Sequence, residues 1–453
     1  MPVDSQHPLY ERHEKMAGRV RDAVAGADAI KAAGTRYLPN PDADDLDRYD
    51  ALRKRAVWFG VTGRTHDGML GAVFRRSPSV ELPPRIEPMM RDADGNGMPL
   101  EQLARLITSQ LLKNGRHGLL TDYPPAPEGA TAEQTAGLLP QISSYHSQDI
   151  INWRVEDNRL VMVVLREHYD DPVDEFESEI EEQHRVLRLE DGAYTQQVYR
   201  NGEPHGEKMT PRDGRGRTFD HIPFQFLGAI NNDETPDKPL LLDIADLNIA
   251  HYVNSADLEE SSHLAGQPMF HIDIGTMTTE EWKELNPNGI KVGVRRGIQT
   301  QGGTANLIQA REHQLPDKLM ERKEAQMLAL GARLIEQSGG AKTAEEILAR
   351  AGAENANLST LATNASRGIL AALRDAALFM NDNPDTVAFQ LNQEFYERGA
   401  EPQMVMARIQ EVDRGLIATK DYRDWRRKTG GIAEDRTDEE IDADIEVAGG
   451  AAL

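Results

Sequence analysis

The chain has 453 residues, with 51 Lys and Arg against 75 Asp and Glu, a formal net charge of -24, and no Cys. This length allows about three domains at roughly 150 residues each, and the missing cysteines exclude disulfides, thiolate metal sites and cysteine nucleophiles. The negative charge argues against a sequence-specific reader of duplex DNA, because such proteins use cations to displace counterions from phosphate. No segment has the apolar pattern of a membrane span or a signal peptide, so we expect a soluble, intracellular protein.

The first 140 residues have mostly helical patterns. Five positions recur at intervals of three or four residues, which is typical of an amphipathic helix; they are Tyr49, Leu52, Ala56, Phe59 and Gly63. A second helix is predicted from Pro99 to Gly115, because proline suits the first helical turn and glycine favours the end of a helix. The proline-rich residues 123–129 predict a loop.

Residues 141–236 have a β pattern instead. Arg159 to Leu165 is rich in β-branched side chains and predicts a strand. Asp191-Gly192 and Asn201-Gly202 predict hairpin turns. The run 170–182 holds eight acids and no Lys or Arg, so we expect it to form a solvated loop or an exposed hairpin tip.

Helical patterns return after Pro236. A long helix is predicted over residues 239–266, and the flank formed by Asn248, His251 and Ser255 is too polar for a simple core helix. Because buried polar groups need hydrogen-bond partners, we expect this flank to contact copies of the same helix in an assembly.

A compact mixed segment is predicted over residues 267–315. It places Trp282 on a short helix with Arg295 and Arg296 nearby. Tryptophan and arginine are frequent anchors of protein interfaces, and packing of Trp282 inside a small core is an equally good interpretation.

Two more long helices are predicted after this segment. The first covers residues 316–337, and Gly339 with Gly340 then interrupts the pattern. Thr343 and Glu346 form a capping box that starts the next helix, which reaches about residue 380.

The C-terminal part is predicted to contain a short β and helical piece over residues 387–417 and an acidic tail from Glu434 to Glu446. That tail has eight acids and one base, which favours disorder. Basic residues cluster in places, and solvated faces or ion pairs with the abundant acids are the plainer interpretation; the clusters are Arg212, Arg215 and Arg217, then Arg295 and Arg296, then Arg423 with Arg426, Arg427 and Lys428.

No catalytic or metal-binding motif is complete. Asp92 to Gly97 resembles the start of an EF-hand loop, but its twelfth position is Leu103 instead of a bidentate carboxylate, so we expect an Asx-rich turn. Gly340 to Thr343 lacks the glycine spacing of a phosphate-binding P-loop, and the 13 His have no metal-ligand spacing. We therefore predict no catalytic, cofactor-binding or metal-binding residues and no enzymatic activity.

Several motifs follow one another along nearly the whole chain, among them Tyr37-Leu38-Pro39, residues 71–78, residues 115–124, Ile151-Asn152-Trp153-Arg154 and residues 247–252. In this order they resemble portal proteins of tailed bacteriophages, and most closely a subgroup labelled only as an uncharacterised phage domain. The resemblance implies a mainly helical α+β portal fold with a wing, a two-helix stem, an α/β clip and a tunnel loop.

The portal plan divides the sequence into consecutive parts. The implied parts are a wing over 1–238 (helical first, β-rich from about 141), a first stem helix over 239–266, a clip over 267–315, a second stem helix over 316–337, a tunnel loop over 338–343, a long helix with a return to the wing over 344–400, and a short crown with the acidic tail over 401–453.

Portal proteins form a ring, usually of twelve subunits, at one capsid vertex, and double-stranded DNA enters and leaves through the channel without sequence-specific contact. The resemblance therefore implies a homo-oligomeric virion protein, assembled in the host cytoplasm, with no cofactor and no membrane contact. It implies terminase, capsid and scaffolding proteins and a head–tail adaptor as partners.

Three candidate sites follow from this plan. Ser338, Gly339, Gly340 and Lys342 would face DNA in the tunnel loop. Trp282, Arg295 and Arg296 would form the docking surface of the clip, and Asn248, His251 and Ser255 would contact neighbouring subunits along the stem. Two alternatives stay open, namely a soluble enzyme with an undetected site and another virion ring component such as a head–tail adaptor, although adaptors are usually much shorter.

Overall fold

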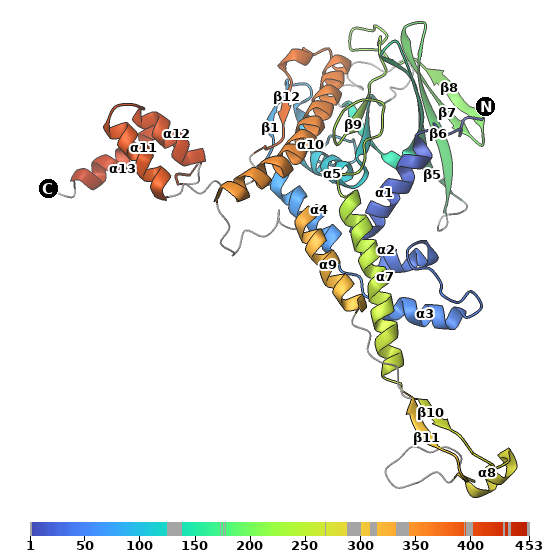
Figure 1. Ribbon diagram of the computed structural model, residues 1–453. Coiled ribbons are helices and arrows are strands. Elements are labelled where there is room, and N and C mark those ends of the chain that lie inside the picture. Colours follow the sequence, from blue (N-terminus) through green and yellow to red (C-terminus); the bar gives the residue numbers. More distant parts are fainter. Residues whose placement is uncertain are drawn as a thin grey trace.

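The protein combines helices with antiparallel β-sheets, which confirms the predicted α+β class (Figure 1). The computed structural model describes residues 2–124, 138–172, 174, 176, 178–267, 269–287, 300–308, 315–331, 344–393, 395, 402–428, 431–433 and 436–450.

The N-terminal part is helical, as predicted. Its elements are α1 (Tyr10–Ala25), α2 (Ala27–Ala32), η1 (Gly34–Arg36), α3 (Leu46–Arg55), α4 (Val61–Val73), η2 (Glu87–Met90) and α5 (Leu100–Asn114). The predicted ends of α5 are confirmed, because Pro99 precedes its first residue and Gly115 follows it with a φ of 68°, a conformation that glycine adopts without steric cost.

The helical spacing from Tyr49 to Gly63 does not produce one helix. Between α3 and α4, residues 56–60 are not helical. Val57 instead donates its backbone N–H to the hydroxyl oxygen of Ser255, at 2.9 Å. The prediction of a continuous helix is therefore wrong, because a distant side chain offers the backbone a competing partner.

Two antiparallel sheets make up most of the β structure. One has the strand order β3-β2-β9 and the other is the meander β4-β5-β6-β7-β8. The strands are β2 (Arg116–Asp122), β3 (Gln141–His146), β4 (Ile150–Glu156), β5 (Arg159–Pro172), β6 (Ser178–Glu190), β7 (Ala193–Arg200), β8 (Glu203–Met209) and β9 (Phe224–Gly228), with η3 (Ser147–Asp149) between β3 and β4.

The predicted hairpin turns are confirmed. Asp191 and Gly192 join β6 to β7 with φ values of 50° and 79°, and Asn201 and Gly202 join β7 to β8 with 50° and 82°. Two successive positive φ values are the geometry that suits a two-residue hairpin. The acidic run 170–182 lies at the ends of β5 and β6, and its described residues are exposed, as predicted.

The main core lies between α10 (Ala344–Phe379), α5 and the three-stranded sheet. A Cβ atom on Gly368 of α10 would lie less than 3.0 Å from three side-chain atoms of Leu227 on β9, so this glycine permits a very close helix–sheet approach. The small sheet β1 (Ser79–Glu81) with β12 (Ala388–Gln390) and the turn η5 (Pro384–Thr386) complete this part. We call α1, α4, α5, α10 and the two large sheets the body.

Two helices extend from the body, and we call them the stalk (Figure 1). They are α7 (Leu242–Ala265) and α9 (Leu315–Leu330), which pack against each other. Their far ends carry β10 (Met269–Ile272), α8 (Thr279–Leu285) and β11 (Ala305–Ile308), which we call the insert. The three long helices overlap the predicted ranges, but α9 ends at Leu330 instead of residue 337, and residues 332–337 lie outside the described residues.

The C-terminal residues form a small helical group, namely α11 (Pro402–Asp413), α12 (Thr419–Lys428) and α13 (Asp438–Gly450). The prediction that the acidic tail is disordered is wrong, because α13 covers much of it. Arg423 pairs with Asp442 and Arg427 pairs with Asp438, and these ion pairs from α12 offset the repulsion between the carboxylates of α13.

Candidate functional site

The polar flank of α7 is buried inside one chain. Asn248, His251 and Ser255 are 0%, 2% and 1% exposed. Asn248 donates its side-chain N–H to the backbone oxygen of Phe59 at 2.8 Å and accepts a hydrogen bond from the hydroxyl of Thr62 at 2.9 Å. Asn248 therefore has its hydrogen-bond partners within one chain, whereas the Nδ1 atom of His251 is buried with no partner among the described residues.

The prediction that Asn248, His251 and Ser255 contact neighbouring subunits is therefore wrong. The physical reason is the non-helical segment 56–60, whose free backbone groups need partners. The backbone oxygen of Val57 accepts a hydrogen bond from the Ser255 hydroxyl at 2.8 Å, in addition to the bond that its N–H donates. The polar flank and the break in the helical pattern therefore explain each other.

The contact between α7 and α9 includes several polar groups beside the buried Met327. The ammonium group of Lys323 donates to the backbone oxygen of Ala250 at 2.8 Å and to the side-chain oxygen of Asn254 at 3.0 Å. The His251 ring lies 3.1 Å from a carboxylate oxygen of Glu324. Burial lowers the pKa of Lys323 from its usual range. Within α9, all of whose residues are described, Met327 is the one buried side chain.

The C-terminal end of α9 is fixed to the body at Gly331. A Cβ atom there would lie less than 3.0 Å from the Cδ1 atom of Ile244 and 3.3 Å from the Cγ2 atom of Thr65. Because glycine has no side chain, the backbone at Gly331 can pass close to Ile244 of α7 and Thr65 of α4. Gly331 is the last described residue before Ala344.

Helix α3 lies along the side of α7 that does not carry α9 (Figure 1). Arg48 and Arg55 both pair with Glu260 of α7, the first at 3.2 Å. Such pairs contribute little energy where water reaches them, but together they set the level of α3 along the stalk.

The insert holds the described part of the predicted docking surface. Thr278 and Glu281 form a capping box at the start of α8, and Trp282 on that helix is half-buried with a buried indole N–H that has no partner among the described residues. Arg295 and Arg296 lie outside the described residues. The docking role of this surface stays a prediction.

The predicted tunnel loop, with Ser338, Gly339, Gly340 and Lys342, also lies outside the described residues, so its contact with DNA stays a prediction. The described chain ends at Gly331 and resumes at Ala344, the first residue of α10. The predicted helix after the loop is present as α10, whereas the helix before it ends at Leu330, earlier than the predicted residue 337.

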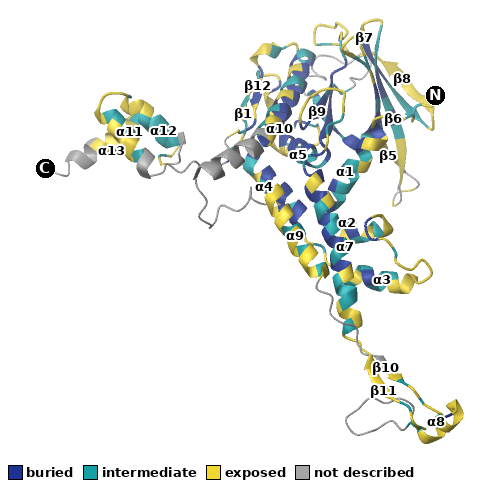
Figure 2. Cartoon of the chain, in the orientation of Figure 1, coloured by how far each residue is buried: buried dark blue, intermediate teal, exposed yellow. Residues whose placement is uncertain are grey.

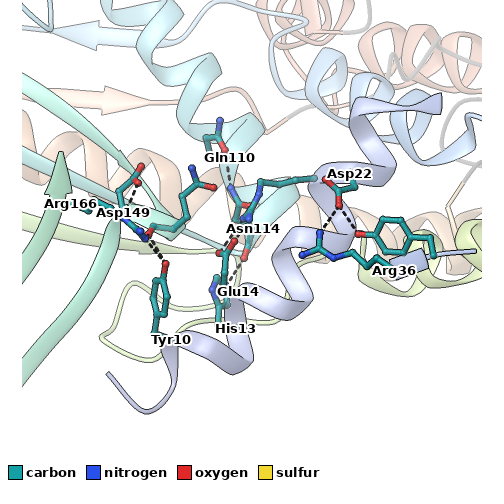
Figure 3. A network of polar contacts seen from close by, with 12 residues as sticks. Tyr10, His13, Glu14, Asp22, Arg36, Gln110, Asn114, Asp149 and Arg166 are labelled. Carbon is teal, nitrogen blue, oxygen red and sulfur yellow. Dashed lines mark hydrogen bonds and ion pairs between the residues drawn. The ribbon is translucent and has the colours of Figure 1, made fainter. Parts of the chain in front are cut away.

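A polar network that was not predicted from the sequence fixes α1 to β5 and α5 (Figure 3). Arg166 of β5 donates to the Tyr10 hydroxyl oxygen at 2.7 Å, and the His13 ring lies 2.7 Å from the backbone oxygen of Asn114 on α5. Arg21 donates to the Asn114 side-chain oxygen at 3.1 Å. Burial lowers the pKa of His13 to about 4, because a charged imidazole would lose its hydration there. Isolated polar residues on a helix give no signal of such partners in the sequence.

A groove of about 710 Å³ lies beside this network, between α1 and α7. Its charged side chains are matched by neighbours of opposite sign, for example Arg19 with Asp246 at 2.8 Å and Arg36 with Asp22 at 3.1 Å. The lining therefore has no excess of charge that would attract an ionic ligand.

The motifs that the sequence analysis interpreted as structural are confirmed as such. A carboxylate oxygen of Asp92 accepts the backbone N–H groups of Gly95 and Gly97 at 2.8 and 2.9 Å, which makes an Asx-rich turn. In the basic loop, Arg217 pairs with Asp213 at 2.8 Å. Among the described residues, no group of three His, Asp or Glu is placed to hold a metal ion, and no helix is long and apolar enough to cross a membrane.

Comparisons with known proteins give partial matches. The family described as a domain of unknown function (DUF4055) matches residues 239–380, which is less than half of the chain. This range contains the stalk, the insert and the whole of α10. None of the curated proteins matches the chain.

Solved structures with a similar fold include chains of gene transfer agent (GTA) particles. A chain of the virion of the native particle is 13% identical with a TM-score of 0.42, covering 86% of this chain and 95% of that one. A chain of the neck of the empty particle, computed with C6 symmetry, is 14% identical with a TM-score of 0.42, covering 90% and 99%. A chain of the neck of the native particle, computed with C12 symmetry, is 14% identical with a TM-score of 0.43, covering 89% and 98%. Likenesses this weak carry no argument about function.

Proposed function

We propose that this chain is the portal subunit of a tailed-phage-like particle, a ring component at one capsid vertex through which double-stranded DNA passes. The observation that carries the proposal is the stalk: two antiparallel helices leave the body and hold a small α/β insert at their far end (Figure 1). This is the arrangement of stem and clip that the sequence resemblance implies. The body then corresponds to the wing, and residues 338–343 to the tunnel loop.

The charge of the chain suits a channel that DNA must traverse. A formal charge of -24 per subunit gives a ring that repels phosphate overall, whereas each phosphate that a protein neutralises adds affinity through counterion release. A transit channel needs weak contact that does not depend on sequence. A single cation per subunit in the tunnel loop, Lys342, would centre the duplex without holding it.

The proposed role is structural and non-enzymatic. The stalk and the insert provide surfaces for protein contacts, and the insert with Trp282 is the proposed docking surface for terminase during packaging and for the adaptor afterwards. Capsid and scaffolding proteins would contact the body. The proposed place of the finished ring is the virion, after assembly in the host cytoplasm.

Native mass spectrometry of the purified full-length chain tests this proposal. We expect closed assemblies of about twelve copies across micromolar concentrations and several salt concentrations, with a stalk-lined channel in negative-stain images. A monomer under all these conditions would contradict the proposal. A ring that lacks a through-channel would favour a different virion ring component.

A further inference from the structure

The outward side of α9 presents an apolar side chain between two cations. Leu319 is 38% exposed, and Lys318 and Arg322 beside it are exposed as well. Figure 2 shows that much of α9 is exposed. No ion pair engages Lys318 or Arg322 within the part of the chain that the structure describes. We call these three residues the α9 patch. A helix that buries only Met327 in its own chain needs another surface to cover its outer side.

The start of α3 presents the opposite charge around another apolar side chain. Leu46 is 70% exposed, and the neighbouring Asp44 and Asp47 are exposed. Neither carboxylate forms an ion pair with any residue that the structure describes. We call these three residues the α3 patch. The two patches therefore combine a leucine with unpaired charges of opposite sign.

The two patches lie on opposite sides of the stalk. On α7, Ala250 and Asn254 contact α9, whereas Tyr252 and Ala256 share a hydrophobic cluster with Leu52 of α3. At about 100° per residue, these two sets point in roughly opposite directions from the helix axis. Figure 1 shows α9 and α3 on either side of α7 accordingly.

The patches also lie at the same level along α7. Lys323 contacts Asn254, and Leu319 is one turn further toward the insert because α9 runs antiparallel to α7. Arg48, next to the α3 patch, contacts Glu260. Asn254 and Glu260 are separated by about 9 Å along α7 at 1.5 Å per residue. Because Leu319 lies one turn, roughly 5 Å, closer to the insert than Lys323, it is nearer to the level of Glu260 than Lys323 is.

From this geometry we propose that the α9 patch of one copy binds the α3 patch of the next copy. Two different patches on opposite sides of one subunit make a head-to-tail contact. Such a contact closes into a ring when the rotation from one subunit to the next is a whole fraction of a full turn. Leucine contacts leucine at the centre, and Lys318 and Arg322 face Asp44 and Asp47 around it. This interface rests on the proposed function, because it identifies where neighbouring subunits of the ring meet.

Cross-linking tests the contact directly, because the natural chain has no Cys. The double variant Leu46→Cys with Leu319→Cys, treated with a short bismaleimide, should give a ladder of covalent species beyond the dimer. The matched control is Leu46→Cys with Leu328→Cys. Leu328 is 41% exposed but lies nine residues from Leu319, on the opposite side of the helix at about 100° per residue. This control should give no ladder.

Charge exchange provides a second, independent test. Lys318→Glu with Arg322→Glu, and separately Asp44→Lys with Asp47→Lys, should each raise the protein concentration for half assembly by about tenfold or more at low salt. Combining the four substitutions should restore assembly. Arg414→Glu with Lys420→Glu is the control for the Lys318 and Arg322 variant, because it changes the net charge by the same amount and in the same direction. Both residues are exposed and lie outside the two patches, so this control should assemble normally.

The possible outcomes separate the interface from the proposed function. If the natural chain forms rings but the Leu46 and Leu319 cysteines give no ladder, or the four-fold charge exchange fails to restore assembly, the interface is wrong and the ring remains. If Leu319→Cys alone gives covalent dimers, the contact is symmetric and the proposal is overturned. If the natural chain forms no ring under any condition, both the interface and the proposed function fail.

Discussion

In the body, α10 approaches the sheet so closely that Gly368 leaves no room for a methyl group beside Leu227. In the stalk, α9 buries only Met327, and Lys323 and Glu324 make polar contacts with α7. The body therefore has the dense apolar packing of a unit that is stable by itself. The contact between the two stalk helices is thinner and includes polar groups. In the proposed ring, neighbouring copies of the chain would cover the exposed surfaces of the stalk.

The largest expected effect is the loss of unfolding free energy of the body at acid pH. Burial lowers the pKa of His13 from 6.5 to about 4, so between these values the unfolded chain binds a proton that the native chain does not. Stability is therefore lost as pH falls below 6.5, and the loss from His13 levels off below about pH 4, at roughly 3 kcal/mol for a shift of this size. Urea unfolding at pH 7, 5.5 and 4.5 measures this effect.

His13→Gln is the control for the acid effect, because glutamine also has a side-chain N–H for the backbone oxygen of Asn114 but does not titrate. Its unfolding free energy should fall less steeply between pH 6.5 and pH 4.5. An identical slope in the two proteins would show that His13 is not responsible.

Removal of a buried hydrogen-bonding side chain from the polar flank of α7 should have the next largest effect on stability. Asn248→Ala leaves the backbone oxygen of Phe59 and the hydroxyl of Thr62 without a buried partner, which should cost about 1–3 kcal/mol. The measurement is thermal unfolding of the single chain at a concentration below that of assembly. Asn306→Ala on the exposed strand β11 is the matched control and should change stability by less than about 0.5 kcal/mol. A normal melting temperature with impaired assembly would reverse our assignment of Asn248 to the inside of the chain.

Close packing in the body predicts a moderate effect at Gly368. Gly368→Ala should destabilise the chain by about 1–2 kcal/mol, because the clash with Leu227 exceeds the gain in helix propensity. Gly71→Ala on α4 is the control, since a Cβ atom there meets nothing within 4 Å, and it should be neutral or stabilising. Equal urea midpoints for the two variants would contradict the account of the core.

The smallest effect is expected where the stalk joins the body. Gly331→Ala brings a methyl group against the terminal Cδ1 atom of Ile244, and this end of a flexible side chain can rotate away. The global cost should stay below about 1 kcal/mol, while hydrogen exchange in α9 becomes faster because that helix has few other contacts. A global destabilisation as large as that of Gly368→Ala would show that the stalk is part of the body's cooperative unit.

The sequence predicts elements whose signals are local. Pro99 and Gly115 mark the ends of α5, and Asp191-Gly192 specifies a hairpin by its own backbone preference. The long helices of the stalk can also be predicted, because their helical patterns repeat over many consecutive residues. The α+β class and the position of the insert between two helices follow directly from these elements.

Prediction from the sequence fails where contacts with residues distant in the chain determine the local structure. The spacing from Tyr49 to Gly63 fits a helix, but Ser255 and Asn248, almost 200 residues later, bind the backbone of this segment. The acidic tail has the composition of a disordered segment, but Arg423 and Arg427 compensate its charges. For the candidate site, the polar flank of α7 was recognised correctly, but its partner was assigned to another subunit because no local pattern identifies residues 56–60.

Cryo-electron microscopy of the purified full-length assembly tests the central claim most directly. The account predicts a closed ring with a continuous channel, with the stalk and insert of every subunit around its axis and α3 of one subunit against α9 of the next. A monomer, a symmetric dimer, or a ring whose stalks are separated from one another by solvent would contradict it.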